Sequence, residues 1–236
     1  MKVTLTDYNK DAVEKLIFSK STRLEMNPYL LEDIQAWPQE AKMKELEYIS
    51  NTIKSSWEFL DYTFMIEGVT RAFTHQFVRN RQGSYAQQTM RMLDKADFTY
   101  LTGPSFKDAG EKAVHLYDAV MSLINMTYKD LIDLGVKVED ARGILPTNIH
   151  TNIMVKYNLR TLSELVASRS SPRTQGEFRD VMEGMYQEVI AVHPWAKMFL
   201  HSKKVEAAKE LDQFIEDTAG SEDRLRIIKL VDILRK

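Results

Sequence analysis

Apolar residues recur along this chain with the two periods that distinguish helices from strands. Spacings of three and four predict a helix over residues 39–53, with an apolar face formed by Met43, Leu46, Ile49 and Ile53. Strict alternation predicts a strand over residues 60–67, with one face formed by Leu60, Tyr62, Phe64 and Ile66. Gly68 follows and is expected to end this strand.

The same periodicities predict the other elements. Helices are expected over residues 10–19, 69–78, 106–134, 139–145, from Asn158 to about residue 169, and over 176–192. Gly135 and Pro146 are placed to end two of these helices, and Asn158 is placed to cap a third. Strand-like segments are expected at residues 3–5, 84–90, 98–101 and 149–155.

The pattern predicts an α+β fold, a helix-rich single domain around a small, mostly antiparallel β-sheet. The last forty residues are highly charged and predict two amphipathic helices divided at Gly220. We therefore expect a domain over residues 1–200 and a C-terminal helical extension over residues 201–236 packed on it.

Composition narrows the function classes. The 236 residues are 44% hydrophobic, which is enough for a buried core. The sequence contains no run of eighteen apolar residues, so no membrane-spanning helix is predicted. The N-terminus lacks an apolar signal core, so we expect a cytoplasmic protein. The chain has 32 basic and 34 acidic residues, so its net charge gives no reason to expect a nucleic-acid partner.

The absence of cysteine excludes disulfides, thiolate metal sites and cysteine nucleophiles. The five histidines show no metal-ligand spacing, so no metal site is expected.

Residues 79–91 carry the strongest chemical signal. Arg79, Arg81 and Arg91 lie within thirteen residues that contain no acidic residue. A guanidinium presents a planar set of donors that matches phosphate, so the cluster suits a nucleotide phosphate and a second anionic group. On charge alone, a solvated basic loop explains it equally well.

This segment resembles the signature of the flavin-dependent thymidylate synthases, R-H-R-x-x-S-x-x-x-x-S-x-R. Matching positions are Arg79, Arg81, Ser84 and Arg91. Thr89 stands for the second serine, whereas Asn80 replaces the histidine.

Three further segments agree with the family in order and spacing. Gln76 fits a glutamine three residues before the signature, and residues 141–146 resemble the family's A-R-x-x-L-P. Residues 158–162 resemble its N-x-R-S-L, and Arg169 follows where the family carries another arginine. The resemblance covers residues 55–195 and implies the thymidylate synthase-complementing type of fold.

The resemblance implies a reaction and its cofactors. Members methylate dUMP to dTMP with methylenetetrahydrofolate as carbon donor and FAD, reduced by NADPH, as hydride source. The better-known route to thymidylate adds a cysteine thiolate to the pyrimidine, which a chain without cysteine cannot do, whereas a reduced flavin supplies the reducing power. The family works as a homotetramer with shared active sites.

The resemblance also implies roles for individual residues. The dUMP site would comprise Gln76, Gln87, Gln88, Thr89, Arg91, Arg142 and Arg169, of which Gln87 and Arg169 would be catalytic. The FAD site would comprise Ser55, Glu58, Arg79, Asn80, Arg81, Asn158, Arg160, Glu164 and Arg173. Arg169 would stabilise the negative charge that develops on a uracil carbonyl as hydride adds.

Departures from the family pattern cluster on the flavin and folate side. Asn80 replaces a histidine, Phe59 and Ile53 stand where histidines flank Glu58, and Glu164 replaces an asparagine. Two alternatives therefore stay open: a related flavin-dependent hydroxymethylase of pyrimidine nucleotides, or a non-catalytic nucleotide-binding homologue. An RNA-binding role is disfavoured by the slightly negative net charge.

Overall fold

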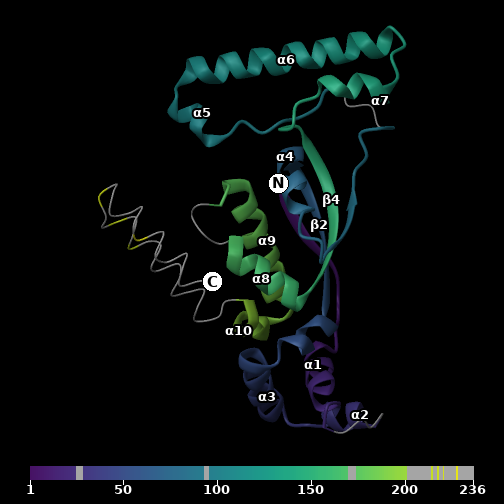
Figure 1. Ribbon diagram of the computed structural model, residues 1–236, viewed down its shortest axis with the longest axis vertical. Coiled ribbons are helices and arrows are strands. Elements are labelled where there is room, and N and C mark those ends of the chain that lie inside the picture. Colours follow the sequence, from purple (N-terminus) through teal and green to yellow (C-terminus); the bar gives the residue numbers. More distant parts are fainter. Residues whose placement is uncertain are drawn as a thin grey trace. The chain divides into compact units, whose positions relative to one another are not determined.

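The structure is a computed structural model (Figure 1) that describes residues 1–24, 29–92, 96–169 and 174–200, with Phe214, Asp217, Gly220 and Ile227. The predicted C-terminal extension lies outside these described residues, except for the last four named. The chain forms two compact units. The first unit comprises Met1–Thr4 and Phe64–Lys156, and the second comprises Leu5–Thr63 and the described part of Tyr157–Lys236.

A four-stranded antiparallel sheet supplies the strands of the fold. Its order is β1-β2-β4-β3, with bounds β1 Lys2–Tyr8, β2 Asp61–Thr70, β3 Ser84–Gln87 and β4 His150–Asn158. In the first unit, β3 pairs with β4 from Ser84 opposite Lys156 to Gln87 opposite Ile153. The small antiparallel sheet among many helices confirms the predicted α+β class. The division into a domain of residues 1–200 and an extension stays a prediction.

The alternating side chains of β2 behave as the sequence predicts. Leu60, Tyr62, Phe64 and Ile66 are all buried. Gly68 does not end the strand as expected, because the chain passes through it at φ +67 and continues to Thr70. Its N–H donates to Asn152 Oδ1 at 3.0 Å. Glycine tolerates this left-handed conformation, so the strand can bend and continue here.

The helical elements described in the first unit are α4 Arg71–Phe77, α5 Pro104–Asp108, α6 Glu111–Asp133, α7 Val138–Ala141 and the 3₁₀ helix η2 Arg142–Ile144. Helix α6 packs against α5, α7 and η2. The continuous helix predicted over residues 106–134 is wrong, because Gly110 at φ +94 separates α5 from α6. Gly135, at φ +85, follows the end of α6 as predicted.

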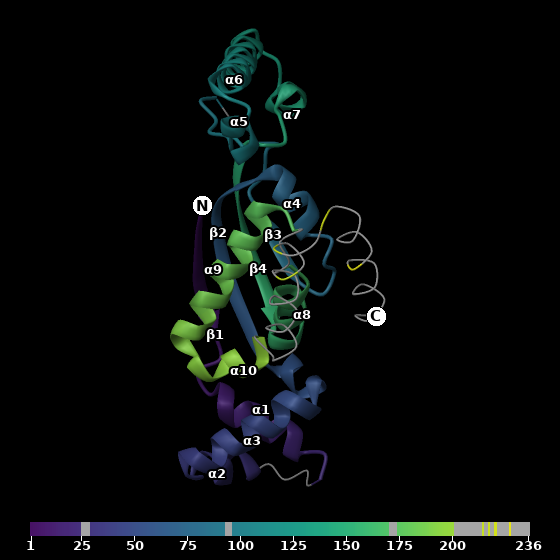
Figure 2. The ribbon, with the colours of Figure 1, turned by 90° about the vertical axis from the view of Figure 1, so that its left-hand side faces the viewer.

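The helical elements of the second unit, within residues 5–24, 29–63, 157–169 and 174–200, are α1 Ala12–Ser21, α2 Leu30–Gln35, α3 Gln39–Thr52, η1 Lys54–Phe59, α8 Leu159–Arg169, α9 Gly176–Val192, η3 Pro194–Ala196 and α10 Lys197–Leu200. Helix α1 packs against α2, α3 and η1, and α8 packs against η1, α9 and α10 (Figure 2). The predicted helices at residues 39–53 and 176–192 are confirmed almost to the residue, whereas α2 and η1 were not predicted.

Aromatic rings join distant segments in the second unit. The Tyr62 hydroxyl hydrogen-bonds His193 Nδ1 at 3.0 Å, and the Tyr8 ring meets the His193 ring edge-on at 5.2 Å. Burial raises the pKa of Tyr62, and burial lowers the pKa of His193 against an opposing hydrogen bond to the Asn9 backbone. The buried position of His193 therefore favours its neutral imidazole.

Candidate functional site

Helix α4 is anchored where the candidate site of the first unit begins. Thr70 caps the helix, with its Oγ1 accepting from the Phe73 N–H at 3.0 Å. The Arg71 N–H donates to the Ile149 carbonyl at 3.1 Å, just before β4. The first residue of α4 is thereby fixed beside the start of β4.

The Arg79–Arg81 segment forms a tight turn between α4 and β3. The Asn80 side-chain oxygen accepts from the Gln82 N–H at 3.0 Å, and the Asn80 carbonyl accepts from the Tyr85 hydroxyl at 2.6 Å. Asparagine is favoured in such turns because its side chain can bond the backbone two residues on. Arg79 and Arg81 are left exposed on either side. Here Asn80 builds the turn that presents the two arginines.

The glutamines of the candidate dUMP set lie on or beside α4 and β3. Gln87 Nε2 donates to Thr74 Oγ1 at 2.7 Å, which ties β3 to α4. The Gln88 N–H donates to the Asn152 carbonyl at 3.0 Å and so extends the pairing with β4. Gln76 lies exposed on α4.

Thr89, Arg91 and Arg142 come together through Glu139. Arg91 Nε contacts a Glu139 carboxylate oxygen at 3.0 Å, while Arg142 Nε donates to the Glu139 backbone carbonyl at 3.1 Å. Thr89 Oγ1 accepts from the Arg91 N–H at 3.1 Å. Segments separated by about fifty residues therefore meet at Glu139.

Arg71 is a cation of this cluster that the sequence did not single out. Its Nη1 donates to the Gln88 carbonyl at 3.3 Å, next to Thr89. Burial and the nearby charge of Arg142 both lower the pKa of Arg71, so the fold keeps two repelling cations close together. Among the described residues, Arg91–Glu139 is the only ion pair that Arg71, Arg91 or Arg142 makes.

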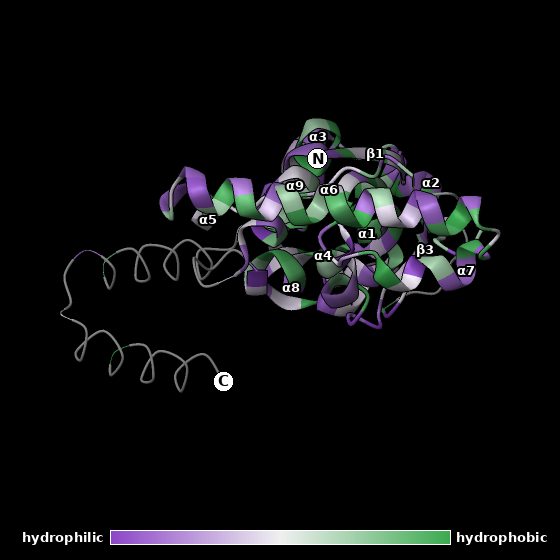
Figure 3. Ribbon diagram, turned by 90° about the horizontal axis from the view of Figure 1, so that it is seen from above, coloured by the Kyte–Doolittle hydropathy of each residue, from purple (hydrophilic) through white to green (hydrophobic). Residues whose placement is uncertain are grey.

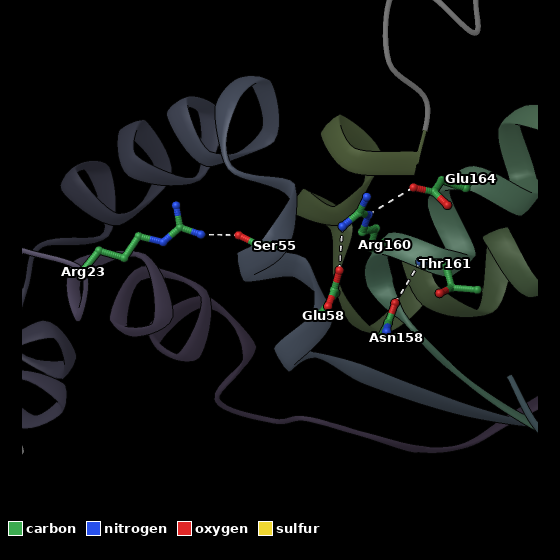
Figure 4. Close-up of polar contacts among 7 residues, drawn as sticks. All are labelled: Arg23, Ser55, Glu58, Asn158, Arg160, Thr161 and Glu164. Carbon is green, nitrogen blue, oxygen red and sulfur yellow. Dashed lines mark hydrogen bonds and ion pairs between the residues drawn. The ribbon is translucent and has the colours of Figure 1, made fainter. Parts of the chain in front are cut away.

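In the second unit, a polar cluster lies between η1 and the start of α8 (Figure 4). Arg160 Nη1 contacts Glu58 Oε1 at 2.6 Å, and Arg160 Nε contacts Glu164 Oε1 at 3.1 Å. Both carboxylates raise the pKa of Arg160, Glu164 more than Glu58. Asn158 Oδ1 accepts from the Thr161 N–H at 2.8 Å, which confirms the predicted cap of α8. Arg23 donates to the Ser55 hydroxyl.

Arg169 lies at the far end of the same helix. It is nine residues after Arg160, about 13 Å along the axis. Its guanidinium lies over the Phe178 ring at 5.0 Å, a cation–π contact that joins α8 to α9. Arg173 lies outside the described residues.

The sequence profile of the thymidylate synthase complementing proteins matches residues 4–195. The match spans most of the chain and both units. The chain belongs to this family.

Individual thymidylate synthase complementing proteins give the same result. The chain is 34% identical to the flavin-dependent thymidylate synthase of Sulfolobus acidocaldarius, over 82% of this chain and 74% of the relative. It is 33% identical to that of Sulfurisphaera tokodaii, over 82% and 75%. It is 31% identical to that of Clostridium tetani, over 82% and 84%. These findings confirm the family that the signature predicted.

The two residue sets predicted from the family distribute differently over the units. The dUMP set lies in the first unit, except Arg169. The FAD set is divided: Arg79, Asn80 and Arg81 lie in the first unit, and the remaining described members lie in the second. Each unit thus holds part of both predicted residue sets.

The residues present fit an anionic flavin cofactor. Arg79 and Arg81 are exposed, and neither makes an ion pair within the described part of the chain. In the second unit, the Ser56 hydroxyl beside Ser55 is buried without a hydrogen-bond partner in the described structure, although buried hydroxyls are normally paired. The two exposed guanidinium groups leave hydrogen-bonding capacity that a phosphate-bearing ligand can satisfy. The Ser56 hydroxyl is buried too deeply for such a ligand to reach it in this structure.

Neither a metal nor a membrane site is found in what the structure describes. Residues 1–24, 29–92, 96–169 and 174–200 contain no group of three metal-ligating side chains. In the same ranges no helix combines the length and the apolarity that crossing a bilayer requires.

Proposed function

We propose that this chain is a flavin-dependent thymidylate synthase. It transfers the methylene carbon of methylenetetrahydrofolate to C5 of dUMP and yields dTMP, using FAD that NADPH has reduced. Family membership and the names of the relatives support this reaction. The observation in the structure that supports it is the cluster of Arg71, Arg91 and Arg142 beside Glu139.

The charge of this cluster matches a phosphomonoester. Arg71, Arg91 and Arg142 contribute three positive charges, and Glu139 contributes one negative charge. The excess of two corresponds to the dianionic phosphate of a nucleotide. The Thr89 hydroxyl, which accepts from the Arg91 N–H, can donate its own hydrogen to a phosphate oxygen. Arg71 extends the dUMP set given by the family resemblance.

Two residues are proposed to act on the pyrimidine. Gln87, held by Thr74, would orient the sugar or base. Arg169 would hydrogen-bond a uracil carbonyl and stabilise the negative charge that develops there as hydride adds to the ring. Gln76 and Gln88 complete the proposed nucleotide site.

The flavin, when bound, supplies the hydride. Arg79 and Arg81 in the first unit, and Arg160 in the second, are each proposed to contact the flavin, whose diphosphate is anionic, because exposed guanidinium groups form strong bonds to phosphate. The other residues of the proposed FAD site are Ser55, Glu58, Asn80, Asn158, Glu164 and Arg173.

The proposal includes a homotetramer, in the cytoplasm, whose active sites combine residues of several copies. An exposed apolar stripe on α6 supports association. Leu116, Val120 and Leu123 are 69%, 45% and 61% exposed, and they share one face at spacings of four and three. Figure 3 shows the apolar bands along α6. Such a stripe is typical of a surface that another chain covers.

Mass spectrometry of the product tests the proposal. The protein is incubated with dUMP, methylenetetrahydrofolate, NADPH and FAD without oxygen. A nucleotide carrying one additional methyl group is expected. A 5-hydroxymethyl product would instead identify the hydroxymethylase. Unchanged dUMP with folded protein would contradict catalysis and leave the non-catalytic nucleotide-binding homologue.

A further inference from the structure

Arg160 is held by two carboxylates from different parts of the second unit (Figure 4). Glu164 lies one turn further along α8 and contacts Nε, whereas Glu58 comes from η1, 102 residues away in sequence, and contacts Nη1. The side chains of Arg160, Glu58 and Glu164 are 41%, 48% and 48% exposed. A ligand in solution can therefore reach the guanidinium and both of its partners.

The net charge of this trio is negative. One guanidinium and two carboxylates sum to −1, so the position that should attract an anion repels it slightly. The Arg79–Arg81 turn is different, because neither of its guanidinium groups makes an ion pair in the described chain. Of the arginines proposed to meet the flavin, Arg160 alone is already occupied by carboxylates in the part that the structure describes.

The geometry makes Glu164 the exchangeable partner. Its contact with Arg160 is the longer of the two, 3.1 Å against 2.6 Å. It is also an exposed pair within one helix, a type of contact that contributes little to stability. When Glu164 leaves, Glu58 still holds the guanidinium in place and the Nε edge becomes available to an incoming phosphate oxygen. A guanidinium binds phosphate best through two neighbouring donors, so freeing this edge matters.

We propose that Glu164 competes with the anionic diphosphate of the flavin for Arg160 and thereby sets the affinity for FAD. This inference rests on the proposed function, which places FAD at Arg160. Glu164 acts through Arg160, so it is a positioning residue that limits cofactor affinity.

The test compares FAD binding by the wild-type chain and Glu164→Gln in a fluorescence titration. The substitution keeps the size of the side chain and removes only its charge. We expect the dissociation constant for FAD to fall about two- to fivefold in 50 mM salt, the range of one exposed ion pair. The gain should largely disappear in 1 M salt, where charges are screened within about 3 Å.

Glu40→Gln is the matched control. Glu40 pairs with Lys44 one turn away on α3, in the same unit, and both are highly exposed. Its removal makes the same change in charge without touching Arg160, and it should leave FAD affinity unchanged. A gain of equal size in this control would mean that only net charge matters and would overturn the inference.

The remaining outcomes separate the inference from the proposed function. FAD binding that is equal or weaker in Glu164→Gln, with clear binding by the wild type, overturns the inference alone. If neither chain binds FAD while circular dichroism shows both to be folded, the proposed flavin site fails and the inference fails with it.

Discussion

Arg71 is half-buried, and a second guanidinium lies close to it. Burial and the neighbouring Arg142 both disfavour the positive charge of Arg71, and the negative charge of a bound phosphate would offset both effects. We expect Arg71→Gln to weaken dUMP binding about tenfold, because a hydrogen bond to a charged group is lost. Isothermal titration calorimetry with dUMP measures the change.

Lys112→Gln provides the comparison for Arg71. Lys112 is exposed on α6, so its loss removes one positive charge from the same unit but outside the cluster. Unchanged dUMP affinity in Arg71→Gln would remove Arg71 from the proposed phosphate site.

Asn80 stands where the family signature has histidine, and its side chain holds the Gln82 N–H. Asn80→Ala should lower the free energy of unfolding by about 0.5–1.5 kcal/mol, the usual contribution of one hydrogen bond. Asn80→Asp retains an accepting oxygen and should lose less. Urea denaturation measures both variants, and equal losses would show that the side-chain oxygen does not stabilise the turn.

At the scale of elements, His193 joins the end of α9 to β2 through Tyr62. Burial lowers the pKa of His193, so the folded state favours the neutral ring. The unfolded chain binds the proton with a pKa of about 6.5. The stabilisation is therefore complete above that pH and is lost as the pH falls below it.

We expect the wild-type melting temperature to decrease when the pH is lowered from 7.5 to 5.5. The decrease should be smaller in His193→Gln, whose side chain cannot be protonated. Thermal melts of both chains followed by circular dichroism measure the difference. His115→Gln, at an exposed position on α6, should follow the wild type. If the melting temperatures of the wild type and His193→Gln changed equally with pH, the lowered pKa of His193 would not contribute to the pH dependence of stability.

The elements that the sequence predicted well are those whose own side chains determine them. The alternation at residues 60–67 and the apolar face at residues 39–53 are local patterns, and both elements were found. Gly68 and Gly110 behaved unexpectedly in opposite ways, because a glycine permits positive φ without indicating whether the element continues. The short elements α2 and η1 carry too few residues to show a period.

The candidate site follows the same division. Arg79 and Arg91 were found because they are close in sequence and match a motif. The role of Glu139 was not predicted, because its contact with Arg91 spans 48 residues and depends on tertiary packing. Arg71 carries no sequence signal apart from its charge.

At the scale of the whole molecule, the stripe on α6 is expected to lie within the proposed tetramer. Leu123→Glu would bury a charge in such an interface, which is costly, so it should shift the protein to smaller assemblies. Size-exclusion chromatography with light scattering measures the mass. His115→Glu places the same charge about 80° around the helix from Leu123, outside the stripe, and should preserve the assembly. An unchanged mass for Leu123→Glu would exclude this face from the interface.

The second unit is built from two stretches of chain, one before and one after residues 64–156 of the first unit in the sequence. Its Leu5 N–H donates to Glu188 at 2.7 Å, across 183 residues. A ribosome must therefore complete residues 64–156 before the contacts that close the second unit can form. Contacts between residues so distant in sequence slow folding, because the intervening chain loses conformational entropy before the contacts that offset this loss can form. During synthesis, residues 5–63 can pack their own helices but cannot contact α8 and α10 until the second stretch has been made. The surface that those helices cover stays exposed for that interval, and exposed apolar surface is what chaperones bind.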